Sequence, residues 1–169
     1  MALHNEIEFE KEICDYLGSH GWIYEDGAAA DYDRKLALYP PDLFAWLEQA
    51  QQDSWENYKQ KNGSKAEKLL LQRLRDVLQQ TGTLDLLRKG LEVAGPTLKL
   101  AEFKPALGLN KEISDRYAAN RLRVIRQVRY SVHNENSIDL VLFLNGIPIA
   151  TAELKTDNTQ SLADAIRQY

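Results

Sequence analysis

SIDLVLFLNGIPIATAELK, residues 137–155, is the stretch that decides which fold this sequence predicts. Two runs of apolar and β-branched residues, 138–144 and 147–154, flank Asn145-Gly146. An Asn-Gly pair between two such runs is the strongest short-range signal for a β-hairpin. Both runs are apolar at nearly every position, which is typical of strands covered on both faces. We therefore expect the central strands of a layered α/β domain.

Three charged residues interrupt this apolar hairpin: Asp139 near the start of the first strand, and Glu153 and Lys155 at the end of the second. Two carboxylates on neighbouring strands repel each other unless a cation lies between them, and Mg²⁺ favours oxygen ligands together with water and phosphate. A lysine two residues after Glu153 points to the same face, where it can orient a metal-bound water. The pattern fits phosphodiester hydrolysis. Glu and Lys at strand ends are also common as solvated surface residues, so the spacing alone leaves both interpretations open.

The length of the hairpin connection decides whether Asp139 and Glu153 can share a metal. With a two-residue turn and no bulge, Asp139 would oppose Ala152, and Glu153 would lie on the other face because side chains alternate along a strand. One extra residue, in a three-residue loop, a bulge at Gly146 or a bulge within one strand, brings both carboxylates to the same face. We predict such an extra residue.

Composition limits the class of protein. The 169 residues are 44% hydrophobic, which is enough for one domain with its own core. A net charge of −4 argues against a protein that coats nucleic acid without specificity. The single cysteine, Cys14, excludes a disulfide within the chain and fits a reducing cytosol. Because the sequence has neither a signal-peptide pattern nor an apolar run of roughly 18 residues, we expect a cytoplasmic protein.

Hydrophobic periodicity predicts helices in the first part of the chain and strands in the last part. Helices are expected at about 6–19, from Pro40 onward, at 65–80, at 84–93 with a stop at Gly95-Pro96, and from about 160. Residues 22–24, 97–103 and 122–132 are predicted to be extended, residues 28–38 to form a loop, and residues 111–120 to form a polar connector. This order predicts the α/β class, with a helical insertion at about 40–95.

Several of these segments carry a resemblance to a known family. Residues 120–131 (NRLRVIRQVRYS), residues 137–157 and the final QSLADAIRQY resemble the amino-terminal nuclease region of the endonuclease, or motor, subunit of type I restriction enzymes. That family is a branch of the PD-(D/E)xK nuclease superfamily, and the resemblance covers nearly the whole chain. It implies a restriction-endonuclease-like core, in which helices flank a central mixed sheet.

The resemblance also implies roles for individual residues. In the family, the aspartate of the hairpin and the glutamate of the ExK motif bind the divalent metal, and the lysine is catalytic. These roles pass to Asp139, Glu153 and Lys155, with Mg²⁺ as the expected metal.

Two further positions match the superfamily less fully. A glutamate on the first helix, eleven residues before a glycine, corresponds to Glu10, counted back from Gly21. A carboxylate in the first turns of a helix is also stabilised by the helix dipole, which explains Glu10 equally well. A glutamine followed four residues later by a tyrosine corresponds to Gln168, but that tyrosine would fall beyond Tyr169. The candidate catalytic residues are therefore Asp139, Glu153, Lys155, Glu10 and Gln168.

Four arginines, Arg121, Arg123, Arg126 and Arg129, crowd the segment predicted as a strand at 122–132. They could contact DNA phosphates, or they could pair with the many Asp and Glu residues of the chain. We favour the pairing. The three histidines are dispersed without ligand spacing, so we assign them no metal role.

The resemblance implies a metal-dependent endonuclease that cleaves double-stranded DNA in the restriction of foreign DNA, assembled with modification and specificity subunits. In the family, ATP-driven translocation belongs to motor domains further along the chain, so we expect the natural protein to continue past residue 169. The sequence has no glycine-rich phosphate loop, so we expect this part to bind no ATP. The alternative is a non-catalytic, nuclease-like assembly module that docks other subunits through its helical insertion. The intact set of Asp139, Glu153 and Lys155 favours the enzyme.

Overall fold

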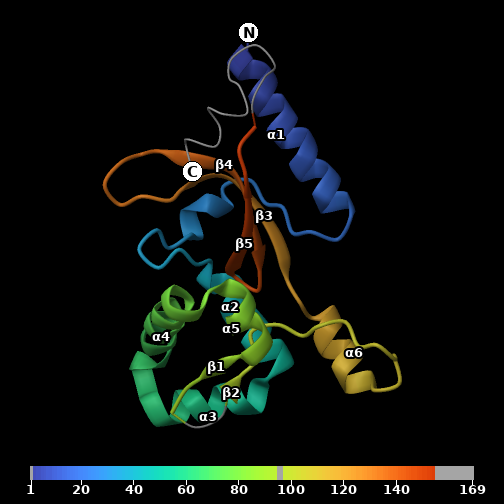
Figure 1. Ribbon diagram of the computed structural model, residues 1–169, viewed down its shortest axis with the longest axis vertical. Coiled ribbons are helices and arrows are strands. Elements are labelled where there is room, and N and C mark those ends of the chain that lie inside the picture. Colours follow the sequence, from blue (N-terminus) through green and yellow to red (C-terminus); the bar gives the residue numbers. More distant parts are fainter. Residues whose placement is uncertain (1, 95–96, 155–169) are drawn as a thin grey trace.

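A computed structural model describes residues 2–94 and 97–154 (Figure 1). Along the chain the elements are α1 (Ala2–Ser19), η1 (Ala28–Asp31), α2 (Pro40–Ala50), α3 (Gln52–Asn62), η2 (Gly63–Lys65), α4 (Ala66–Thr81), α5 (Thr83–Lys89), β1 (Leu91–Glu92), β2 (Thr97–Leu98), α6 (Lys111–Ala118), β3 (Leu122–Arg129), β4 (Ser137–Leu144) and β5 (Ile147–Ala152). The strands β3 to β5 and α1 lie in the upper part of Figure 1, α2 to α5 lie below them, and α6 projects to one side. The predicted α/β class is confirmed.

The main sheet has the order β3-β4-β5, with both pairs antiparallel. Ile23 joins β3 from the other side through a parallel bridge to Arg123, in which the Ile23 amide donates to the Leu122 carbonyl at 2.7 Å. The predicted extended segment at 22–24 is thus confirmed. A separate small sheet pairs β1 with β2.

The hairpin turn has the conformation that Asn-Gly favours. Leu144 pairs with Ile147, so the connection is a two-residue turn. Asn145 and Gly146 have φ values of 50° and 78°, the positive values that a type I′ turn requires at both central positions. Asn145 is fully buried, and its side-chain Nδ2 donates to the Leu100 carbonyl at 2.9 Å. The turn is therefore an internal junction of the molecule.

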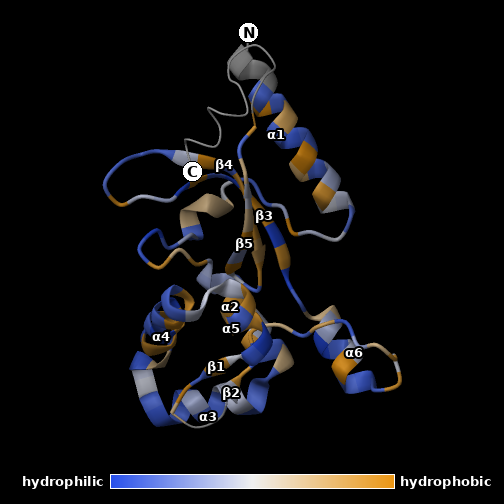
Figure 2. Ribbon diagram, in the orientation of Figure 1, coloured by the Kyte–Doolittle hydropathy of each residue, from blue (hydrophilic) through white to orange (hydrophobic). Residues whose placement is uncertain are grey.

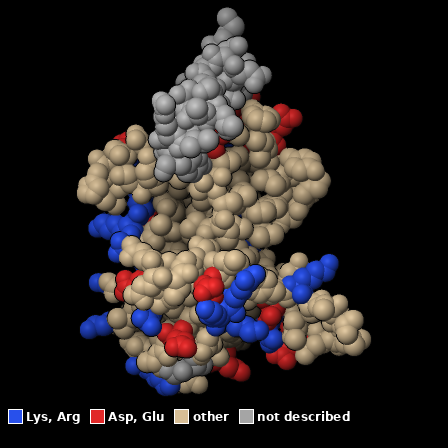
Figure 3. Space-filling view, in the orientation of Figure 1, with Lys and Arg blue, Asp and Glu red and all other residues tan. Residues whose placement is uncertain are grey.

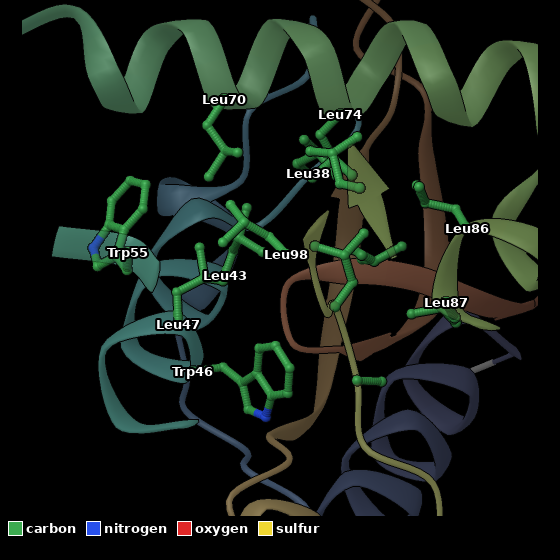
Figure 4. Close-up of a cluster of buried hydrophobic side chains, with 14 of the residues drawn as sticks. Leu38, Leu43, Trp46, Leu47, Trp55, Leu70, Leu74, Leu86, Leu87 and Leu98 are labelled. Atoms are coloured by element: carbon green, nitrogen blue, oxygen red, sulfur yellow. The ribbon is translucent and has the colours of Figure 1, made fainter. Parts of the chain in front are cut away.

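Hairpin residues contribute to all three hydrophobic clusters of the fold. Ile147 belongs to the largest cluster, which is built mainly by α2 to α5. In Figure 4, α4 lies across this cluster and directs Leu70 and Leu74 into it. Phe143 belongs to a second cluster beneath the β3–β4 pair. Leu140 belongs to the third, together with Cys14 of α1.

Helix α1 covers one side of the main sheet with a single face. Hydrophobic and hydrophilic bands alternate along this helix in Figure 2. On the sheet side, Cys14 packs against Val124 and Leu140, whereas Phe9 and Tyr16 remain exposed. Burial raises the pKa of the Cys14 thiol to about 11, so it is protonated at neutral pH.

A buried ion-pair network ties α2 to β3. The Asp42 carboxylate, 1% exposed, accepts hydrogen bonds from Arg123 Nε at 2.6 Å and from Arg121 Nε at 2.8 Å. Arg123 also donates to Glu25 at 2.8 Å, and its guanidinium lies over the ring of Tyr39. The other two arginines of this segment form ion pairs as well, Arg126 with Glu10 and Arg129 with Glu135. The favoured interpretation of this cluster, pairing with carboxylates, is confirmed.

Some sequence predictions were wrong. Residues 111–120 are not a polar connector, because Lys111–Ala118 forms α6. This helix begins at Asn110, whose side chain accepts a hydrogen bond from the Ile113 amide. Ion pairs four residues apart, such as Lys111 with Asp115, support it further.

Other predicted bounds needed correction. The helix expected at 84–93 ends at Lys89, because Gly90 adopts a φ of 80° and the chain continues as β1. Helix α3 was not predicted, and the strand expected at 122–132 ends at Arg129. The hairpin is not covered on both faces throughout, since Ile149 of β5 is 40% exposed. Gly95-Pro96 and the helix expected from about 160 lie outside the described residues.

The buried turn predicts that Gly146→Ala strongly destabilises the fold. A Cβ atom at Gly146 would lie 2.2 Å from the Tyr39 carbonyl oxygen, and φ is positive there as well. We expect a loss of about 2 to 5 kcal/mol in the free energy of unfolding, from backbone strain and overlap together. Gly21→Ala is the matched control, because Gly21 has a φ of 90° but open space around it, and we expect about 1 to 2 kcal/mol. Urea unfolding checks both values, and equal losses would contradict the account of the turn.

The buried ion pair predicts that Asp42→Asn is destabilising. The substitution keeps the shape of the side chain but leaves Arg123, 4% exposed, without its main counter-charge. Breaking one partner of a buried pair costs roughly 3 to 5 kcal/mol. The control is Asp85→Asn, which removes an exposed pair with Lys89, and we expect little change in the urea midpoint. A similar midpoint for the two variants would show that the Asp42 pair does not stabilise the junction.

Candidate functional site

An extra residue in β5 changes the pairing of the hairpin. Next to the turn, Leu144 pairs with Ile147. Further along β4, Leu142 pairs with Ala150, one position later than an unbroken ladder would give. Ile149 is thus the additional residue of a β-bulge within β5. The predicted extra residue is confirmed, and it lies in the strand while the turn keeps two residues.

The bulge sets a register that, continued past the last pair of Leu140 with Ala152, puts Asp139 and Glu153 on the same face of the hairpin. Beyond it, Val141 pairs with Thr151. Two residues further along each strand, this register places Asp139 opposite Glu153. Asp139 also contacts the chain directly after Glu153, because its Oδ2 accepts a hydrogen bond from the Leu154 amide at 2.7 Å. In this register the two carboxylates would be neighbours on adjacent strands.

Glu10 is buried in the middle of α1. The helix begins at Ala2, so Glu10 lies beyond its first turns and the helix-dipole interpretation is wrong. Only 2% of the residue is exposed. Its Oε2 accepts from Arg126 Nε at 3.2 Å, and its Oε1 accepts from Gln127 Nε2 at 2.8 Å. Burial opposes the charged form of Arg126, but hydrogen bonds to Tyr24 and Glu10 raise the pKa of Arg126 above its ordinary value.

Gln127 connects Glu10 to Asp139. Its Nε2 donates to Glu10 and also lies 3.3 Å from Asp139 Oδ1, while its Oε1 accepts from the Ser137 hydroxyl at 2.7 Å. Its backbone φ is 50°, a left-handed conformation that costs a residue other than glycine about 1 to 3 kcal/mol. Gln127 was not among the site residues predicted from the sequence. The signal is its place across from Asp139 in the β3–β4 pair, which becomes visible only once the register is known.

Asp139 and Glu153 fit a magnesium site built from two carboxylates. Mg²⁺ is commonly held by one or two carboxylates and completes its shell with water and phosphate. Asp139 accepts hydrogen bonds from Leu154 and Gln127, and a carboxylate has roughly four lone-pair positions, so it retains capacity for a cation. Within residues 2–94 and 97–154, no group of three or more His, Cys, Asp or Glu is arranged to hold a metal. Lys155 and Gln168, the other predicted site residues, lie outside the described residues.

A hollow of about 250 Å³ lies beside Gln127 and is also lined by Arg126 and Asp26. On the face shown in Figure 3, Lys and Arg are interspersed with Asp and Glu over the lower helices and form no continuous basic surface.

Comparison with known proteins identifies the family. The family model for the type I restriction enzyme R protein N terminus matches residues 4–169. No curated protein and no solved structure matches the chain. In the part of the chain that the structure describes, no helix is long and apolar enough to span a membrane. With the family model covering almost the entire sequence, the chain belongs to the family of N-terminal domains of type I restriction enzyme R proteins.

Proposed function

We propose that this domain is a metal-dependent endonuclease that hydrolyses phosphodiester bonds of double-stranded DNA. Membership of the R protein family supports a role in restriction. The observation that supports the more specific proposal is the bulge at Ile149, because it gives β4 and β5 the register that would set Asp139 opposite Glu153. A strand without the bulge would separate the two carboxylates, and a shared metal would be impossible.

The residues of the chain would divide the work as follows. Asp139 and Glu153 would hold Mg²⁺, with one strand supplying each carboxylate. When bound, the metal supplies charge that polarises the phosphate and lowers the pKa of the attacking water. Lys155 would lie two residues beyond Glu153 and take part in orienting or deprotonating that water. Glu10 would stay buried beside Arg126, and we assign Gln168 no step.

We propose that the domain acts within a larger assembly. In the resembled family, modification and specificity subunits accompany the R subunit, and motor domains consume the ATP. The substrate of this domain is then the DNA backbone, while another subunit reads the target sequence. This division fits a site built from carboxylates and from arginines that are already engaged in ion pairs.

The alternative, a docking module that uses the helical insertion, has less support. The buried side chains of α2 to α5 form the largest hydrophobic cluster of the fold. Among the large hydrophobic side chains of residues 40–94, Leu69 and Leu84 are exposed, and they lie on different helices. An apolar docking surface needs a contiguous patch, and two separate residues do not supply one.

The proposal predicts that Asp139→Ala in the full-length subunit, assembled with its partner subunits, abolishes DNA cleavage while ATP hydrolysis continues. We expect cleavage to fall on the order of 10³-fold, because the metal contributes several kcal/mol to the reaction. Glu153→Ala and Lys155→Ala should behave in the same way. Asp115→Ala, which removes an exposed carboxylate of α6, is the control and should cleave normally. Cleavage by the Asp139 variant at near the wild-type rate would contradict the proposed site.

A further inference from the structure

We propose that Gln127 is a positioning residue of this site, whose side-chain amide fixes the orientation of the Asp139 carboxylate for the metal. The inference rests on the proposed function, because it assumes that Asp139 binds a cation. It adds a residue that belongs to none of the motifs found in the sequence. Three observations carry it: the polarity of the contacts of Gln127, its backbone conformation, and the charge of the groups around Asp139.

The contacts leave one orientation for the amide. Ionised carboxylates only accept hydrogen bonds, so the amide nitrogen must be the atom that faces Glu10 and Asp139. The two hydrogens on Nε2 match the two carboxylates. On the other side, the Ser137 hydroxyl donates to Oε1 at 2.7 Å. Every polar atom of the side chain thus has a role in holding the amide between α1 and β4.

The backbone of Gln127 is distorted in a way that strand pairing does not require. Arg126 pairs with Leu140 and Val128 pairs with Ile138, so the register is the same on both sides of Gln127. At Gln127 itself φ is 50°. Successive side chains of a regular strand point to opposite faces, yet Arg126 and Gln127 both contact Glu10. The left-handed conformation therefore serves to aim the side chain of Gln127.

The carboxylates of Glu10 and Asp139 differ in the charge of the groups that donate hydrogen bonds to them. The positively charged guanidinium of Arg126 forms an ion pair with Glu10. Asp139 accepts from two neutral donors, the Leu154 amide and Gln127 Nε2. Within residues 2–94 and 97–154 these donors hold the Asp139 carboxylate in place without cancelling its charge, which leaves that charge for a cation. Glu10 then acts indirectly: it is buried, it accepts a hydrogen bond from Gln127 Nε2, and it thereby helps to hold the amide in place.

The test uses the full-length subunit without ATP and measures Mn²⁺ binding by the loss of the free-ion EPR signal. Gln127→Gly relieves the positive φ but also removes the amide that donates to buried Glu10. Because these effects oppose each other, we expect the variant to fold with a melting temperature near that of the wild type. Its dissociation constant for Mn²⁺ should rise roughly 10- to 100-fold, the usual effect of removing a group that orients a metal ligand. In the assembled enzyme, the Mg²⁺ concentration for half-maximal cleavage should rise by a similar factor, and excess Mg²⁺ should restore the rate.

Ala37→Gly is the matched control, because Ala37 also has a positive φ, 56°, but lies in the segment between η1 and α2. It should bind Mn²⁺ as the wild type does. Ser137→Ala, which removes only the hydroxyl that holds Oε1, should weaken binding in the same direction by a smaller factor. If Gln127→Gly lowers the melting temperature, the Mn²⁺ affinity of Ser137→Ala tests whether the Gln127 amide positions Asp139.

Asp139→Ala separates the two proposals. If this variant binds Mn²⁺ and cleaves DNA like the wild type, the proposed function fails. If it loses both properties, while Gln127→Gly and Ser137→Ala keep the wild-type affinity for Mn²⁺, the proposed function stands and the role of Gln127 is refuted. Weakened binding in the Gln127 and Ser137 variants, with normal binding in Ala37→Gly, supports the positioning role.

Discussion

The alternation of side chains along a β-strand is the constraint on which the candidate site depends. A two-residue turn at Asn145-Gly146 would by itself place Asp139 and Glu153 on opposite faces of the sheet. One additional residue, Ile149, moves each later side chain of β5 to the opposite face of the sheet, relative to its partner in β4. The fold thus keeps the turn that Asn-Gly favours and still brings the carboxylates together. The position of a single residue links the backbone geometry to the proposed chemistry.

The contacts of the turn explain why the extra residue, Ile149, lies in the strand and not in the turn. Asn145 is fully buried, with hydrogen bonds to Leu100 and to the Arg121 amide, and the Tyr39 amide donates to the Gly146 carbonyl. These bonds join the turn to the helical part of the molecule and to the start of β3. A longer loop at this junction would displace them. Ile149 lies where β5 is exposed, and there an extra residue disturbs little packing.

Much of the site could be predicted from the sequence because its determinants are local. The Asn-Gly signal gave the hairpin, and counting residues showed that an extra one was needed for Asp139 and Glu153 to meet. The location of the bulge was not predictable, since it depends on the contacts that fix the turn. Gln127 could not be recognised either, because its partners Glu10 and Asp139 come from distant segments. The environment of Glu10 was misjudged because α1 begins earlier than the pattern from residue 6 indicated.

The same reasoning explains the errors in the fold. Helix α6 was missed because an N-cap at Asn110 and ion pairs support it, and it buries no side chain in a core. The helix expected at 84–93 was overextended because Leu91 continues the apolar pattern, although Gly90 has already ended the helix. By contrast, α4 matched its prediction within about one residue at each end, since its apolar face is regular and fills the largest cluster. Hydrophobic periodicity predicts the bounds of a helix well where one face of that helix is buried in a core.

A crystal structure of the domain soaked in Mn²⁺, with the ion located by its anomalous scattering, would show whether Asp139 and Glu153 bind the same metal ion. The account predicts one ion bonded to a carboxylate oxygen of Asp139 and to one of Glu153, at about 2.0 to 2.2 Å. It also predicts that Gln127 still contacts Asp139 when the ion is bound. An ion held elsewhere, or a β5 strand without the bulge and with the two carboxylates on opposite faces, would contradict the account.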